Sequence, residues 1–225
     1  MRTKTLILTV ALSAAGIATS LAQVYSVNAV GYVNQNIPTG YSMVANPFVV
    51  QTNTLNALLP LGQVPAFVTL FKFEGGQYTV ATLDPDEGWL SNAQPVGDTE
   101  TIVFGDGVFL LNPAAPFTLT WVGEVAQSNP PGTPVTNPLI AGYQIKSSKI
   151  PQPGKVTTDL GYPAEPFDTL FKFDTVGQTY NVYTYDPDEG WLRNASPDEP
   201  QLGIAESAFF LRSAVGSWDR IFSVN

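Results

Sequence analysis

An internal repeat constrains the fold of this chain more than any other feature of its sequence. The segment Thr69–Phe73 recurs unchanged as Thr169–Phe173, and Asp84–Leu90 recurs unchanged as Asp186–Leu192. The second match covers seven consecutive residues and follows the first in both copies, so we do not attribute it to chance. The chain is therefore expected to contain two copies of one module of about a hundred residues.

Two weaker matches support the same alignment. The pair Gly40-Tyr41 returns as Gly142-Tyr143. The apolar segment at residues 108–111 also aligns with residues 208–211. The repeat therefore extends over most of the chain.

The N-terminus has the pattern of a secretory signal peptide. Arg2 and Lys4 precede an uncharged apolar run over residues 6–18, and the small residues Ser20 and Ala22 suit a signal peptidase. The run is too short to span a bilayer comfortably, and no later segment is apolar enough to do so. We therefore expect a secreted, periplasmic or cell-surface protein without a transmembrane segment after cleavage.

These features divide the chain into three parts. Residues 1–22 are the expected signal peptide, 23–121 the first β module and 122–225 the second, with a Pro-rich loop inserted at 127–138. Cleavage would remove two basic residues and change the formal net charge from −9 to −11. A chain this acidic is expected to repel nucleic acid and anionic membrane surfaces.

Short alternations of apolar and polar residues, separated by turn residues, predict strands throughout both modules. The Glu-Gly-Gly-Gln turn at 74–77 predicts a hairpin, and residues 107–111 with 117–125 predict a second strand pair. Further strands are expected at residues 30–33, 41–45, 169–173, 180–185, 208–212 and 218–224, and short helices at 54–59 and 156–160. The sequence thus predicts an all-β fold of two tandem antiparallel β-sandwich or small-barrel modules, with at most one short helix each.

The residue types that the chain lacks exclude several chemistries. The sequence has no histidine and no cysteine, which excludes a Ser-His-Asp triad, a histidine metal site, a thiolate nucleophile and a disulfide. It contains neither a Walker loop nor a dinucleotide-binding fingerprint. Each module must therefore be held by its own apolar core, and no cofactor is expected.

The repeated Asp-Pro-Asp-Glu-Gly-Trp segment is the most distinctive candidate for a functional site. In one interpretation it is a turn, whose first aspartate bonds backbone amides ahead of it and whose tryptophan enters the core. In another it binds calcium, because it crowds hard oxygen ligands into one loop. The candidate calcium ligands are Asp84, Asp86, Asp186 and Asp188, and the whole candidate set adds Glu87, Trp89, Glu189 and Trp191.

The third interpretation is a carbohydrate-binding platform. Trp89 or Trp191 would stack on a sugar ring while carboxylates and tyrosines bond its hydroxyl groups. The tyrosines concerned are Tyr78, Tyr180, Tyr183 and Tyr185. A glycan hydrolase that uses a carboxylate pair is a further alternative, although carboxylates so close in one turn are expected to be solvated and both ionised.

Several segments together resemble a known group of bacterial proteins. They are Val27–Asn34 (VNAVGYVN), Gly40–Pro47 (GYSMVANP), the Leu-Phe-Lys-Phe strand, the DPDEGW turn and Gly105–Leu110. In this order they resemble a family of exported, largely uncharacterised proteins of Verrucomicrobia and related bacteria. More loosely, they are similar to β-modules of bacterial surface proteins with the pattern GWNLIxNP…GxGFFV. The resemblance implies no activity, substrate or binding residue.

The two ends of the mature chain are similar to each other. Val24–Asn28 and Ile221–Asn225 both alternate apolar and polar residues, as strands do. We expect both to lie at sheet edges, where unpaired backbone groups also permit self-association. The sequence as a whole favours a secreted, non-catalytic structural or adhesive protein of the cell surface or extracellular matrix. A carbohydrate-binding module is the alternative, and a glycan hydrolase is third.

Overall fold

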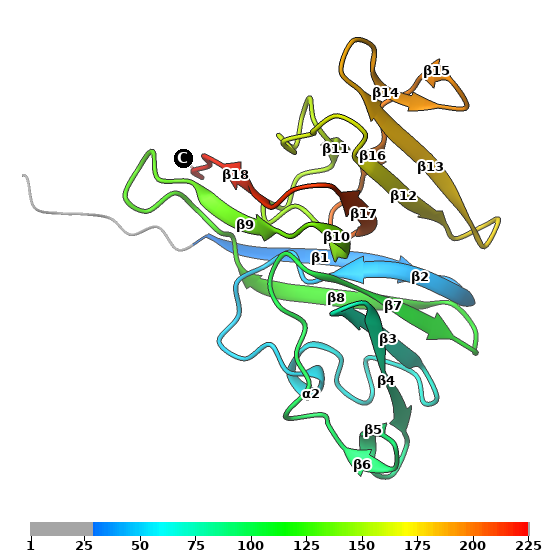
Figure 1. Cartoon of the computed structure of the whole chain (residues 1–225). Coiled ribbons are helices and arrows are strands. Elements are labelled where there is room, and N and C mark those ends of the chain that lie inside the picture. The colour runs from blue at the N-terminus through cyan, green and yellow to red at the C-terminus, as the bar shows by residue number, and fades with distance from the viewer. Residues whose placement is uncertain (1–28, 225) are drawn as a thin grey trace, which may run out of the picture.

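The computed structural model describes residues 29–224 and confirms an all-β fold (Figure 1). The first half contains β1 (Val30–Ile37), β2 (Gly40–Ala45), α2 (Leu55–Leu58), β3 (Thr69–Glu74), β4 (Gln77–Asp84), β5 (Gly88–Ser91), β6 (Gln94–Pro95), β7 (Gly107–Asn112) and β8 (Phe117–Glu124). The second half contains β9 (Val135–Leu139), β10 (Gly142–Lys146), β11 (Gly154–Lys155), β12 (Thr169–Asp174), β13 (Thr179–Asp186), β14 (Gly190–Arg193), β15 (Ser196–Pro197), β16 (Gln201–Leu202), β17 (Ala208–Arg212) and β18 (Gly216–Arg220). The expected signal peptide and the segment Val24–Asn28 lie outside the described residues. In the described part of the chain, residues 29–224, the structure contains no helix with the length and hydropathy of a membrane span.

Each half of the chain forms a six-stranded antiparallel sheet, and both sheets have the same strand order. The first runs β2-β7-β3-β4-β5-β6 and the second runs β10-β17-β12-β13-β14-β15. The registers also match, because Leu70 lies opposite Leu110 in the first sheet and Leu170 lies opposite Phe210 in the second. Within the described residues neither sheet closes on itself, so the small-barrel alternative is not realised.

A two-stranded ribbon accompanies each sheet. β1 pairs with β8 along its whole length, and β9 pairs with β18. The prediction that residues 107–111 pair with residues 117–125 was therefore wrong. β7 is buried along nearly its whole length and lies between β2 and β3, which satisfy its backbone groups on both sides. Residues 135–138 of the expected loop insertion belong to strand β9 instead.

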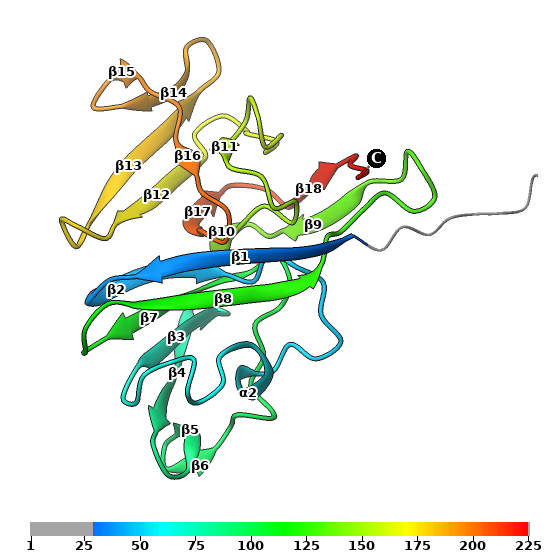
Figure 2. The same ribbon diagram turned by 180° about the vertical axis from the view of Figure 1, so that it is seen from behind.

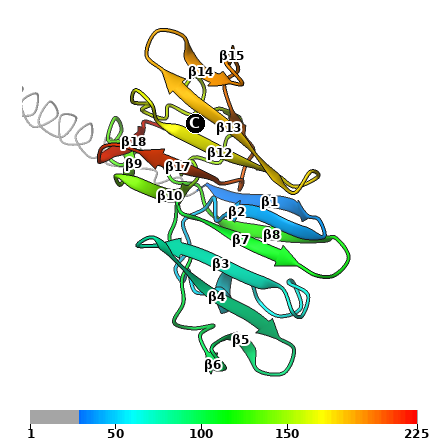
Figure 3. The same cartoon turned by 45° about the vertical axis from the view of Figure 1, so that its right-hand side comes forward.

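One face of each sheet covers an apolar core. The first core includes Ile37, Leu55, Leu70, Trp89 and Trp121. The second includes Leu139, Tyr162, Leu170, Trp191 and Trp218. The β1/β8 ribbon covers the first core, because Ile37 of β1 and Trp121 of β8 belong to it, and the opposite faces of the two sheets meet each other. Figures 1 and 3 show β3 and β4 on one side of the β1 and β2 strands, and β12 and β13 of the second module on the other.

Only the first of the two expected helices forms in the described residues. Helix α2 covers Leu55–Leu58, whereas residues 156–160 form successive turns. Glu199 Oε1 accepts the backbone N–H groups of Thr157 (2.7 Å) and Thr158 (2.8 Å), which are among the first amides of the segment and would lack a partner within a helix. Leu160 donates its N–H to the Lys155 carbonyl (2.9 Å), five residues back, and Gly161 follows with a left-handed φ of +67°. The segment therefore ends in turns where the apolar spacing alone predicts a helix.

The C-terminal segment does not form the strand that its alternation predicts. β18 ends at Arg220, and residues 221–224 have no regular structure. The segment is still held, because Ser128 donates its N–H to the Phe222 carbonyl (2.7 Å) and Phe222 donates its N–H to Ser128 Oγ (2.9 Å). Val224 donates its N–H to Gln127 Oε1 (2.9 Å). Side-chain acceptors replace a backbone ladder here, so no strand pair is completed.

Candidate functional site

The two acidic segments form matching turns. Asp84 Oδ1 accepts the N–H groups of Asp86 (2.8 Å) and Glu87 (3.0 Å), and Asp186 makes the same two bonds in the second copy. Gly88 follows with φ of +80°, a left-handed conformation that glycine adopts without strain. The first aspartate of each turn is therefore engaged by its own backbone, as the turn interpretation requires.

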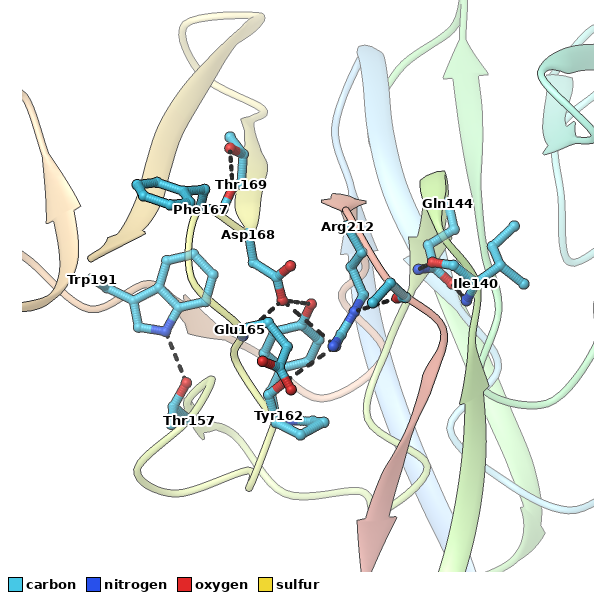
Figure 4. Close-up of polar contacts among 12 residues, drawn as sticks. Ile140, Gln144, Thr157, Tyr162, Glu165, Phe167, Asp168, Thr169, Trp191 and Arg212 are labelled. Atoms are coloured by element: carbon cyan, nitrogen blue, oxygen red, sulfur yellow. Dashed lines mark hydrogen bonds and ion pairs between the residues drawn. The ribbon is translucent and has the colours of Figure 1, made fainter. Parts of the chain in front are cut away.

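The two tryptophans of these turns are buried. Trp89 is 1% exposed and donates Nε1–H to the Leu59 carbonyl (2.9 Å), and Trp191 is 4% exposed and donates to Thr157 Oγ1 (2.8 Å; Figure 4). A sugar ring cannot stack on an indole whose faces are packed in a core. The prediction that Trp89 or Trp191 serves as a glycan platform was therefore wrong.

The acidic turns bring no set of metal ligands together. In the part of the chain that the structure describes, no three acidic side chains gather in a geometry that could hold an ion. Asp86, Glu87, Asp188 and Glu189 lie on exposed turns and Asp84 is half-buried. The arrangement gives neither a calcium cage nor a carboxylate pair enclosed in a cleft.

Aromatic side chains gather instead between the two modules. The outer faces of the sheets, those turned away from their own cores, meet through Met43 and Phe109 of the first module and Ile145 and Phe209 of the second. Ring contacts extend this centre into one inter-module aromatic cluster, made of Tyr41, Phe71, Phe73, Tyr78, Phe109, Tyr143, Phe171, Phe173, Tyr180 and Phe209.

Equivalent residues exchange contacts across this cluster. Phe73 meets Phe209 at 5.1 Å between ring centroids, and Phe109 meets Phe173 at 5.4 Å, both with near-perpendicular planes. Edge-to-face pairs of this kind contribute about 0.5–1.5 kcal/mol each beyond the burial of their surface. The two copies are thus related by an approximate two-fold axis through the cluster.

The backbones follow the same symmetry. Ala45 donates its N–H to the Ala205 carbonyl (2.9 Å), and the equivalent Ser147 donates its N–H to the Gly105 carbonyl (3.0 Å). An ion pair between Lys146 and the Asp106 carboxylate also joins the modules. Polar bonds and packed rings therefore hold the two sheets together at the same place.

Four tyrosines border the cluster and remain accessible to solvent. Tyr41, Tyr78, Tyr143 and Tyr180 are 39%, 47%, 51% and 38% exposed, and we call them the tyrosine rim. Burial and the neighbouring Tyr78 raise the pKa of Tyr180 to about 12. Its hydroxyl therefore keeps its proton at neutral pH and can donate a hydrogen bond as well as accept one.

A buried ionic network lies elsewhere, inside the second core (Figure 4). Asp168 Oδ2 accepts hydrogen bonds from the Tyr162 hydroxyl (2.9 Å) and the Glu165 N–H (3.1 Å), and it lies 3.5 Å from Arg212 Nη1. Asp168 is 1% exposed and Arg212 4% exposed. Burial raises the pKa of the Asp168 carboxyl above its ordinary value. No substrate can reach these groups, so we assign them to folding.

A cleft of about 200 Å³ opens beside the cluster and is lined by Lys72, Phe73, Tyr143 and Lys146, among other residues. Both of its lysines are already paired. Lys72 Nζ lies 2.8 Å from Glu100 Oε1, and Lys146 is bound to Asp106. The cleft therefore offers no free cation to an anionic ligand.

Sequence reasoning identified part of the rim and missed the rest. It singled out Tyr78 and Tyr180 for glycan contact, and it placed Phe109 and Phe209 in the strands expected at 107–111 and 208–212 without assigning them a role in binding. Tyr41 and Tyr143 entered only as parts of a repeated Gly-Tyr pair. The signal in the sequence was the strand Leu70–Phe73, which has an apolar residue on each face. Leu70 faces the core, so Phe71 and Phe73 on the other face need a second surface to cover them.

Comparisons with known proteins do not extend this description. The sequence matches no protein-family model, and no curated protein or solved structure is significantly similar to it.

Proposed function

We propose that this protein is an exported, non-catalytic structural or adhesive protein of the cell surface or extracellular matrix, and that it makes contact through the tyrosine rim. The observation that carries the proposal is the inter-module aromatic cluster, which leaves four of its tyrosines 38–51% exposed. Tyrosine offers a large contact area with little conformational entropy to lose, and it is enriched in binding surfaces for that reason.

The rim is supported from beneath by packed rings. Tyr78 contacts Phe73 at 5.1 Å, and Tyr180 contacts Phe173 at 5.3 Å. Each phenylalanine in turn contacts a ring of the opposite module. A partner would therefore meet side chains that are already positioned, which lowers the entropic cost of binding.

The proposed export rests on the N-terminal pattern of basic, apolar and small residues. Fractionation of the producing cells, with the N-terminus of the recovered protein determined by mass spectrometry, tests it. We expect the protein outside the cytoplasm with residues 1–22 removed. Recovery of an intact N-terminus from the cytoplasm would contradict the proposal.

Adhesion can be tested with beads that carry the purified protein. We expect them to attach to the surface or matrix of the producing cells, and the double variant Tyr78→Ala/Tyr180→Ala to attach several-fold less. Phe67→Ala is the matched control, because Phe67 is 60% exposed and lies outside the aromatic cluster. Equal attachment of all three proteins would remove the rim from the proposal.

Carbohydrate binding at the same rim is the second candidate. Tyr78 and Tyr180 have half-exposed rings, and Tyr78 lies close enough to contribute to the raised pKa of Tyr180. Proteins hold sugars by stacking and hydrogen bonding of this kind of side chain. Retardation of the protein in gels that contain polysaccharide would detect it. Tyr78→Phe keeps the ring and removes the hydroxyl, so weaker retardation of this variant would indicate hydrogen bonding rather than apolar adhesion.

A further inference from the structure

Strand β1 presents a long free edge. It pairs with β8 alone, in a register that sets Val30 opposite Glu124. The backbone of Glu124 bonds in both directions to Val49 rather than to Val30, and Val125 donates its N–H to the Ala29 carbonyl. Because antiparallel pairs alternate between bonded and non-bonded positions, the N–H and C=O groups of the even-numbered residues of β1 point away from β8. These residues are Val30, Tyr32, Asn34 and Asn36.

Nothing in the sequence of β1 protects this edge. The strand reads VGYVNQNI and contains neither a charged residue nor a proline, which are the usual means by which proteins block edge pairing. Val30 is 73% exposed and Tyr32 63% exposed, and Val122, opposite Tyr32 on β8, is 53% exposed. Figure 2 shows β1 at the front of the molecule, with β8 along one edge and the second module drawn beyond the other.

The equivalent edge in the second module is blocked. Its strand β9 is three residues shorter than β1 and carries Pro138 where β1 has Asn36. The carbonyl of Thr136, equivalent to Asn34, accepts a hydrogen bond from Lys149 Nζ (2.8 Å). The two copies of the repeat thus differ at this edge, and only the first leaves it open.

Other sheet edges of the described chain are also covered or short. The outer strands β6 and β15 each have two residues and end in proline. On β2, the Gln178 side chain bonds both the N–H and the carbonyl of Tyr41. On β8, the Gln63 side chain donates to the Thr120 carbonyl (2.8 Å), and Val49 exchanges two backbone hydrogen bonds with Glu124. In residues 29–224, β1 is therefore the longest strand whose free edge nothing caps.

We propose that β1 pairs antiparallel with β1 of a second copy of this chain, so that two molecules form a closed dimer. In another copy the matching long open edge is β1 itself, which gives a self-complementary contact about a two-fold axis. With the axis near Tyr32, the two exposed Tyr32 side chains come side by side on one continuous four-stranded surface. Charge permits the approach although the chain is acidic, because Glu124 is the one charged residue of the β1/β8 ribbon.

The test is the mass of the protein in solution, measured by sedimentation over a range of concentrations. We expect a reversible dimer. Asn34→Pro removes an edge N–H and adds bulk where a new strand must approach, while the bonds between β1 and β8 stay intact. It should raise the dimer dissociation constant by about tenfold or more, whereas Asn34→Ala should leave the dimer in place.

A second variant keeps the result interpretable if proline disturbs the strand. Tyr32→Lys introduces a charge at the centre of the contact, and two copies of that charge repel each other across the axis. We expect a monomer with an unchanged melting temperature. A wild-type chain that stays monomeric at every concentration would overturn the proposal, as would a dimer of unchanged affinity in both Asn34→Pro and Tyr32→Lys. Neither outcome depends on the tyrosine rim, so this test is independent of the proposed function.

Discussion

The two copies of the repeat solve the same packing problem with different residues. Asp168 and Arg212 of the second module occupy the positions of Val68 and Asn112 in the first. Val68 is fully buried, whereas Asp168 needs Tyr162 and Arg212 around it. Burial of an ion pair costs the hydration free energy of both groups, and their attraction offsets that cost only when the geometry is good, so a buried pair is weak evidence for added stability. Removal of one partner, however, leaves a buried charge without compensation and is strongly destabilising.

Removal of the arginine measures that cost. Arg212→Leu should lower the free energy of unfolding by about 3–5 kcal/mol, because it leaves the Asp168 carboxylate buried and unpaired. The double variant Asp168→Val/Arg212→Asn, which installs the residues of the first module, should recover most of the loss. Urea denaturation measures both. A single variant as stable as the wild type would show that water reaches Asp168.

The ionisation of Asp168 makes stability depend on pH. Burial raises its pKa above the ordinary value of 3.8, so the folded state holds this proton more tightly than the unfolded state. The contribution of Asp168 to stability is thus fully present below pH 3.8 and is lost as the pH rises through the folded pKa. We expect the stability of the wild type relative to Asp168→Asn to fall over this interval, as followed by urea denaturation at successive pH values. A rise over the same interval would mean that Arg212 outweighs burial.

At the scale of single elements, the turns were the structures that the sequence predicted best. The roles of Asp84 and Gly88 in the acidic turn follow from their residue types and spacing alone, and so does the hairpin at residues 74–77. Helix prediction failed at residues 156–160 because Leu160 donates its N–H to the Lys155 carbonyl, five residues back, and Gly161 follows in a left-handed conformation. The apolar spacing of these residues carries no information about either backbone conformation.

The acidic turns give a prediction about calcium. Asp84→Ala together with Asp186→Ala removes two hydrogen bonds from backbone N–H groups in each copy. Each lost hydrogen bond should reduce the free energy of unfolding by about 0.5–1.5 kcal/mol, so the melting temperature should fall. Calcium at millimolar concentration should leave the wild-type melting temperature unchanged, since Asp84 Oδ1 already serves the backbone. Glu87→Gln is the control for loss of charge alone. A calcium-dependent rise that the alanine variant abolishes would restore the metal interpretation.

A close backbone approach joins the strands of the two modules. A Cβ atom on Gly107 would lie 2.2 Å from Ser207 Oγ and 2.6 Å from Ile145 Cγ2. Ser207 is the residue equivalent to Gly107 in the second module, and its hydroxyl donates to the Val44 carbonyl (3.1 Å). One copy must therefore be glycine so that the other can carry a side chain at the crossing.

Gly107→Ala should accordingly destabilise the protein by about 1–3 kcal/mol, because the modules must separate to admit a methyl group. Combination with Ser207→Gly moves the glycine to the other copy and should restore part of the loss. Thermal unfolding of the wild type and these two variants measures this. Equal stability of Gly107→Ala and the wild type would contradict the crossing described here.

At the scale of the whole molecule, the sequence predicted the modules but not their arrangement. The matched segments predict two similar sheets, and the sheets have the same strand order. The pairing of β1 with β8 joins residues that lie 80 to 94 positions apart, and no turn between the two strands signals it. A side-chain hydrogen bond from Trp121 to Gln35 links the same two strands. The two sheets pack through Phe109 and Phe209. In sequence, each of these residues belongs to an ordinary strand pattern, and neither pattern shows that it will be covered by the other module.

The proposal that the tyrosine rim is a contact surface can be tested where the protein works. Hydroxyl-radical footprinting would compare the reactivity of Tyr78 and Tyr180 in the isolated protein with their reactivity in the surface or matrix fraction of the producing cells. The proposal predicts that both tyrosines react readily in the isolated protein and are protected several-fold in place, while the exposed Phe167 keeps its reactivity. Rim tyrosines that react equally in both preparations would contradict it.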